Sequence, residues 1–247
     1  WIQAFAELGG DVAWMRFWDR LTDEIKQTAD QNAMMALLRQ AKRRAALLIA
    51  LGDLSQAWNL GQVTRALSDF ASLAVDASLA LLLQKAHAAG EIRLPNPEQP
   101  LEGSGILIIG MGKLGAYELN YSSDIDLIVL YDAACHPYAG DELGAILVRL
   151  TRQLVRMLEE RTGDGYVFRT DLRLRPDPGS TPLALSLTAA ETYYEAFGQN
   201  WERAAMIKAR AVAGDKKAGE GFLKFLRPFV WRKNLDFAAI QDIHSIK

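Results

Sequence analysis

Two aspartates separated by one residue, Asp124 and Asp126, stand where an apolar run begins. Alternate side chains of a β-strand share a face, so a strand here places both carboxylates on one side and Ile125 on the other, in the core. Two ionised carboxylates at this separation repel each other, and a divalent cation between them removes that cost. Mg²⁺ prefers carboxylate and phosphate oxygens. The pair is therefore a candidate magnesium site, and the simpler alternative is an exposed strand end.

A second charged strand is predicted in the stretch TDLRLRP, residues 170–176. Strand alternation places Asp171, Arg173 and Arg175 on one face and the intervening leucines on the other. A third carboxylate can complete a two-metal site, and a guanidinium group can pair with phosphate oxygens as a bidentate fork. Combined with the first two acids, this face favours a metal and phosphate site over an ordinary salt-bridged strand.

The glycine-rich stretch GMGKLG at 110–115 follows a strand predicted at 106–109. It matches the dinucleotide pattern G-x-G-x-x-G, and Asp132 lies 20 positions after Gly112, where a ribose-binding acid would stand. However, the segment before Asp124 holds only about two helical turns, too few for a crossover between parallel strands. Carboxylates also do not suit the start of a buried parallel strand. The dinucleotide interpretation is the weaker one.

A phosphate site gives the glycines a different role. A strand followed by a tight glycine turn presents backbone N–H groups to a phosphate. Gly110 and Gly112 are therefore candidate phosphate contacts, and Lys113 adds a positive charge. Ser122 and Ser123, beside the acids, either donate to phosphate or turn the chain, and turning is favoured.

The elements that position these residues are predicted from periodicity. Residues 1 to about 92 have helical spacing, with Trp14 and Trp18 one turn apart, and the basic KRR run at 42–44 is interpreted as a solvated helix face. Three prolines within 94–105 indicate a linker. Beyond it we predict strands at 106–109, 125–131, 166–175 and 182–187, and helices at 113–120, at 143–158 with Asp141 as its cap, and from 188 onward.

This order of elements predicts an α+β fold, with a mixed sheet flanked by N- and C-terminal helical regions. We expect a helical region at 1–98, a catalytic core at 99–190 and a second helical region at 191–247. The chain opens without Met and stops inside a predicted helix, so we expect a piece of a longer protein.

Composition narrows the function classes. The 247 residues, half of them hydrophobic, suffice for one large or two modest cores, and the net charge of -2 disfavours a nucleic-acid partner. No run predicts a membrane span: the most apolar long segment, 70–83, is interrupted by Asp76. The single Cys135 excludes an internal disulfide and suits a reducing cytoplasm. His87, His136 and His244 lack metal-ligand spacing and are interpreted as surface or structural residues.

The motifs and their order resemble the nucleotidyltransferase superfamily typified by DNA polymerase β. Within it, the stretches 110–132, 164–176 and 200–215 resemble the bacterial bifunctional glutamine synthetase adenylyltransferase/deadenylylase family, over essentially the whole chain. The resemblance implies a polymerase-β-like mixed sheet. It implies metal carboxylates at Asp124, Asp126 and Asp171, phosphate or nucleotide contacts at Gly110, Gly112, Lys113, Ser123, Arg173 and Arg175, and either a place in the pocket or a solvated face for Lys208 and Arg210.

That family has two homologous halves. One transfers AMP from ATP to a tyrosine of glutamine synthetase, and the other removes it by phosphorolysis, which releases ADP. The stretches SSDIDLI, YVFRTDLRLRP and WERAAMIKAR resemble the removing half. The implied cofactors are two Mg²⁺ ions, with ADP or ATP and inorganic phosphate as substrates or products. The implied partners are glutamine synthetase and a PII-type nitrogen signal protein, in the cytoplasm, without nucleic acid or membrane.

Three alternatives stay open beside the removing half and the weaker dinucleotide-binding oxidoreductase. One is the adenylylating half. Another is a nucleotidyltransferase of the same fold that acts on RNA, DNA or a small antibiotic. The third is a nucleotide- or metal-sensing module without turnover.

Overall fold

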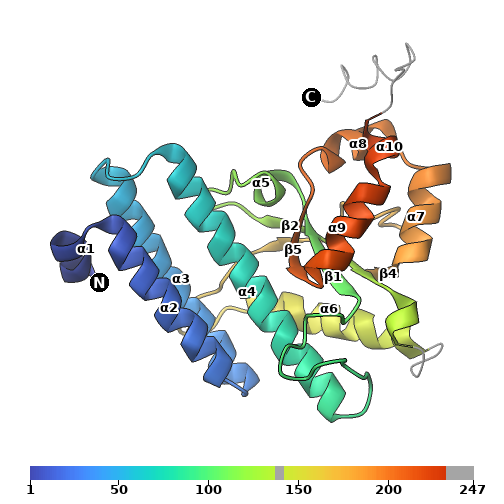
Figure 1. Cartoon of the computed structure of the whole chain (residues 1–247), viewed down its shortest axis with the longest axis horizontal. Helices are drawn as coiled ribbons and strands as arrows, with labels where there is room; N and C mark the ends of the chain where they lie inside the picture. The colour runs from blue at the N-terminus through green and yellow to red at the C-terminus, as the bar shows by residue number, and fades with distance from the viewer. Residues whose placement is uncertain (137–141, 232–247) are drawn as a thin grey trace.

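Four helices form the N-terminal part of the computed structural model, which describes residues 1–136 and 142–231. They pack side by side, and the longest runs diagonally across the centre of the molecule (Figure 1). Asp30 caps the third helix through the N–H of Ala33, and Asn59 and Gln62 form a capping box on the fourth. The helices are α1 (Ile2–Leu8), α2 (Gly10–Gln27), α3 (Gln31–Leu54) and α4 (Leu60–Ala88).

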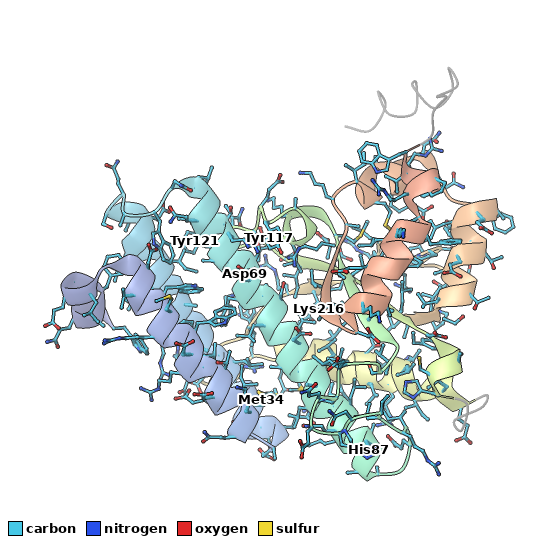
Figure 2. All side chains as sticks on the ribbon, viewed as in Figure 1. Met34, Asp69, His87, Tyr117, Tyr121 and Lys216 are labelled. Carbon is cyan, nitrogen blue, oxygen red and sulfur yellow. The ribbon has the colours of Figure 1, made fainter. Side chains whose placement is uncertain are left out.

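Helix α4 is long and apolar enough to cross a membrane by length and composition alone. However, 78% of its most apolar stretch is buried inside the protein, as is usual for a core helix. It contacts α3, α6 (Leu143–Glu159) and the sheet. Its Asp76 accepts the N–H of Gly214 and pairs with Lys216, which lies beside α4 (Figure 2).

A mixed five-stranded sheet carries the central segment, which confirms the predicted α+β class. The strand path is β3-β2-β1-β5, with β4 also paired to β2. β1 is antiparallel to β2 and β5, whereas β2 is parallel to β3 and β4. Because β1 and β2 are antiparallel neighbours, the dinucleotide crossover is excluded. The strands are β1 (Ile106–Gly110), β2 (Ile125–Tyr131), β3 (Thr170–Asp171), β4 (Ala184–Ser186) and β5 (Arg210–Gly214).

Both faces of the sheet are buried, which explains why β1, and β2 beyond Asp126, are continuous apolar runs. Ile125, Leu127 and Val129 belong to a core shared with the N-terminal helices and α6. Ile128 and Leu130 face a second core under the C-terminal helices. The remaining helices are α5 (Gly112–Gly115), η1 (Ala133–Cys135), α7 (Leu187–Ala196), α8 (Asn200–Met206), α9 (Lys216–Phe225) and α10 (Arg227–Val230).

Several element predictions are wrong in extent or type. The strand predicted at 166–175 is reduced to Thr170–Asp171, and the helix predicted at 113–120 to Gly112–Gly115. The region predicted as helical beyond 188 contains a strand, β5, which pairs with β1 in the sheet. The predicted cap Asp141, the surface or structural role of His244 and the helix predicted at the end of the chain lie outside the described residues.

Candidate functional site

The three predicted acids meet at one end of the parallel pair β2 and β3. Asp126 and Asp171 are register partners on these strands, and Asp124 directly precedes β2. The pKa of Asp126 is raised above its ordinary value, first by burial and then by the negative charges of Asp171 and Asp124. Positive charge on Arg173 and Lys113 opposes the rise. The strand geometry therefore brings two carboxylates, Asp124 and Asp171, near the half-buried Asp126.

Arginines hold the two outer carboxylates. Arg169 pairs with Asp124 and donates to the carbonyl of Ser122 at 3.0 Å. Arg173 forms a fork on Asp171, with Nη2 2.5 Å and Nε 2.9 Å from Oδ2. Hydrogen bonds from Arg173 lower the pKa of Asp171. The inner Asp126 carboxylate accepts no hydrogen bond from any residue that the structure describes.

The carboxylate oxygens of Asp124, Asp126 and Asp171 suit a hard cation, although these side chains do not converge on a single point. Within residues 1–136 and 142–231, no three His, Cys, Asp or Glu side chains converge closely enough to hold a metal ion. The cause is that Asp124 and Asp171 are turned toward their arginines. Both ion pairs are solvent-exposed, and exposed pairs contribute little to stability. Three carboxylates, one of them crowded by the others, are the ligands that Mg²⁺ prefers.

The glycine turn packs directly on Asp126. The Met111 N–H donates to the Asp126 carbonyl at 2.9 Å, which fixes the turn against β2. Gly112 has φ +52, and a Cβ at this position would lie 2.7 Å from Asp126 Oδ2. A Cβ at Gly115 would lie 1.9 Å from the Lys208 carbonyl oxygen. The turn therefore requires glycine for conformation at one position and for close approach at the other.

Arg175 does not share the exposed face with Arg173, so its predicted place at the phosphates is corrected. Its side chain is buried and donates to backbone carbonyls of the loop that follows β3. The strand ends at Asp171, so the alternation that grouped the two arginines does not continue. The structure gives Arg175 a role in holding the loop, and its carbonyl partners are those of Leu172, Pro178, Thr181 and Pro182.

The remaining predicted residues lie around the turn. Ser123 Oγ donates to Asn120 Oδ1 at 2.8 Å, as expected of a serine that turns the chain. Lys113 and Lys208 are exposed, and Lys208 pairs with Glu118 at 2.6 Å. Gly110 closes β1 against Val212 of β5.

Arg210 lies behind the glycine turn and supports it. Its guanidinium stacks 3.8 Å from the centre of the Tyr117 ring, and Nη2 donates to the Leu114 carbonyl at 3.0 Å. Arg65 of α4 stacks on Tyr117 as well, at 3.9 Å, and pairs with Asp69. Tyr117 lies beside α4, close to Asp69 of that helix (Figure 2). This sandwich, the Tyr117 ring with Arg65 and Arg210 stacked on it, joins the turn to the N-terminal helices.

Two cationic side chains of α3 point into the protein, and the sequence pattern did not predict them. Arg39 is fully buried, with Nε 2.9 Å from the Gly165 carbonyl and Nη1 3.0 Å from that of Met157. Lys42 donates to the Val167 carbonyl and lies over the Phe168 ring, and burial lowers its pKa to about 8. The predicted solvated face at 42–44 is therefore wrong for Lys42.

Two further residues that fix β3 were also missed. Glu159 Oε1 accepts the Thr170 N–H at 2.6 Å and its hydroxyl at 2.7 Å. Arg169 stands two positions before Asp171, so strand alternation applied one step further predicts it on the acid face. The Glu159 contact depends on where α6 lies, which no local pattern reveals.

Comparison with known proteins adds independent observations. The family model for glutamate-ammonia ligase adenylyltransferase (GlnE) matches residues 6–225. The chain is 58% identical over 215 residues to the bifunctional glutamine synthetase adenylyltransferase/adenylyl-removing enzyme of Rhizobium meliloti, covering 87% of this chain and 22% of that protein. The enzyme of the same name from Brucella suis is 53% identical over 236 residues, covering 93% and 24%. The chain thus spans less than a quarter of the length of these relatives.

Proposed function

Because the chain belongs to the glutamate-ammonia ligase adenylyltransferase family, we propose that it is a nucleotidyltransferase domain that acts on glutamine synthetase. The proposed reaction is phosphorolytic removal of AMP from a modified tyrosine, which releases ADP. The name of its relatives includes both the transfer and the removal of an adenylyl group. The resemblance of its three motif stretches to the removing half favours removal. A PII-type signal protein as partner and a cytoplasmic location belong to the same proposal.

One observation carries this proposal: the half-buried Asp126 is the register partner of Asp171 and follows Asp124 by two residues, and burial together with the charges of these two acids raises its pKa. Such crowding costs stability unless the site serves a cation. We propose that these three carboxylates hold Mg²⁺. When bound, the metal neutralises charge on the phosphoryl oxygens and orders the reacting groups.

The chain's own residues have distinct roles in the proposed reaction. An oxygen of inorganic phosphate attacks the AMP phosphorus, and the bond from phosphorus to the tyrosine oxygen breaks. The phenolate leaves and takes a proton from water. Arg173, next to Asp171, stabilises negative charge on the phosphoryl group. Gly112 keeps the backbone of the turn against Asp126, so that the turn and Lys113 face the phosphates.

The test is incubation of the chain with AMP-modified glutamine synthetase, inorganic phosphate and Mg²⁺, followed by measurement of ADP. We expect Mg²⁺-dependent ADP release that Asp126→Asn abolishes without loss of fold, checked by circular dichroism. Asp23→Asn, in an exposed ion pair on α2, is the matched control and should retain full activity. Full activity of Asp126→Asn would refute the metal site.

The adenylylating direction is the second candidate, because the name of the relatives includes it. The same three acids serve transfer in either direction, so the site does not select one. Supplying ATP and unmodified glutamine synthetase tests this direction. AMP transfer to the tyrosine, without ADP release in the first assay, would reassign the chain to the adenylylating half.

A further inference from the structure

An open groove of about 690 Å³ lies beside the carboxylates, between α6 and the segment that carries β3. Four arginine side chains line it, Arg152, Arg161, Arg169 and Arg173, together with the carboxylates of Asp124, Glu159 and Asp171. Clustered guanidinium groups in a concave surface raise the local concentration of anions. The arginines outnumber the carboxylates that line the groove, so its net charge is positive, and two of those carboxylates, Asp124 and Asp171, are acids that the proposed function uses.

Two of the four arginines are uncommitted to a carboxylate. Arg169 and Arg173 pair with Asp124 and Asp171. Arg152 makes no hydrogen bond or ion pair with any residue in the described part of the chain. Arg161 contacts the Tyr166 ring, with its guanidinium carbon 5.4 Å from the ring centre. Two guanidinium groups thus line the groove without an anionic partner among the described residues.

The helix α6 places Arg152 on a rigid support. Arg152, Val155 and Glu159 follow helical spacing and line the groove together. Glu159 in turn holds β3 through Thr170. Arg156, one turn beyond Arg152, pairs with Glu160 and does not line the groove. The helix therefore fixes Arg152 relative to β3, and with it to Asp171.

We propose that this groove binds a phosphate oxyanion, with Arg152 and Arg161 as its ligands. The inference rests on the proposed function and names the subsite that receives the phosphate. Guanidinium groups bind phosphate through paired, charge-assisted hydrogen bonds, and Arg is suited to this geometry. Inorganic phosphate and the phosphate of a nucleotide offer the same chemistry, so the test separates the two sources.

The binding test compares the melting temperature of the chain in sodium phosphate and in sodium chloride at matched ionic strength, because chloride reproduces the screening alone. A parallel titration uses AMP. We expect phosphate to raise the melting temperature beyond chloride, and Arg152→Gln and Arg161→Gln to weaken the apparent affinity by about 10–100-fold, as for charged hydrogen bonds. Arg156→Gln is the matched control and should bind as the unaltered chain does.

Each outcome of the melting experiment either supports or overturns the groove as an anion site. No phosphate or AMP effect in the unaltered chain, or the same affinity in all variants, overturns the groove as an anion site. An effect with AMP alone that Arg152→Gln removes supports the site and assigns its phosphate to the nucleotide. Circular dichroism shows whether Arg152→Gln and Arg161→Gln are folded. If one of them is not, the other still tests the groove.

A kinetic test separates this inference from the proposed function. In the ADP-release assay, Arg152→Gln should raise KM for inorganic phosphate at least about tenfold and leave kcat within about twofold. Absence of ADP release by the unaltered chain refutes the proposed function, while the melting experiment still judges the groove. ADP release with an unchanged phosphate KM in both variants refutes the groove as the phosphate subsite.

Discussion

Replacing Arg39 by Met should destabilise the protein more than any exposed substitution on the same helix. The Arg39 guanidinium is fully buried and donates to the carbonyls of Met157 in the last turn of α6 and of Glu160 and Gly165 on the segment between α6 and β3. Met keeps much of the side-chain volume and removes every donor. The carbonyls lose their partners where water has poor access, and each such loss costs about 1–3 kcal/mol.

The expected loss in the free energy of unfolding is about 3–5 kcal/mol, because removing the buried charge itself offsets part of the cost. For a chain of this size, this corresponds to a fall in Tm of roughly 6–20 °C. Urea denaturation followed by tryptophan fluorescence measures the free energy, and differential scanning calorimetry measures Tm.

Arg43→Met is the matched control. Arg43 lies on the same helix and contacts the same segment through Asp164, but its side chain is 60% exposed. An exposed ion pair contributes about 0–1 kcal/mol. If Arg39→Met costs no more than Arg43→Met, the buried guanidinium does not hold this segment and the reasoning is wrong. Hydrogen exchange adds a local check: amides at 165–170 should exchange faster in Arg39→Met alone.

Three further predictions concern the site. The folded-state pKa of Asp126 is raised, so its contribution to stability is present below the unfolded pKa near 4 and is lost as pH rises through the folded value. With EDTA present, Asp126→Asn should therefore melt above the unaltered chain at pH 7, and a difference that does not shrink toward pH 4 would contradict this. Gly112→Ala should lower the free energy of unfolding, measured by urea denaturation, by about 1–3 kcal/mol, because Gly112 has a left-handed backbone conformation. It should also lower kcat, because the added Cβ displaces the Asp126 carboxylate. Gly221→Ala is the control, since a Cβ at Gly221 meets open space. Tyr117→Leu should cost about 1–2 kcal/mol in the same experiment, since it removes two cation–π contacts, and no loss would mean that the sandwich does not support the turn.

The sequence predicts the elements whose residues are buried on both faces. β2 is predicted with the bounds that it has, because an apolar run such as Leu127–Tyr131 is typical of a central strand and alternation extends it through Asp126 to Ile125. β5 was missed because its residues after Arg210, AVAG, are small and the strand follows a helical stretch. Pairing with β1 makes this segment a strand, and that pairing depends on tertiary structure.

The residues of the candidate site also divide into those that local sequence patterns predict and those that depend on tertiary contacts. Placing Asp124, Asp126 and Asp171 together needed only strand alternation and one strand pairing. Alternation failed at Arg175, because the Arg173 N–H donates to the Asp171 side chain at 2.8 Å and the chain leaves the sheet there. A local hydrogen bond of this kind competes with the strand ladder. Arg39 was hidden for another reason: apart from the Met35 carbonyl on its own helix, its partners lie more than 100 positions away in the sequence.

The contacts of the N-terminal helices bear on whether residues 99–190 can act alone. Arg39 and Lys42 of α3 hold the segment that leads into β3, and Arg65 of α4 supports the glycine turn through Tyr117. One continuous core joins these helices to the sheet, and β5, beyond residue 190, covers the open edge of β1. A segment cut at 99 and 190 loses the supports of both β3 and the turn and exposes an unpaired strand. The three acids are therefore positioned by the whole described chain, and the helical region at 1–98 is part of the site's framework.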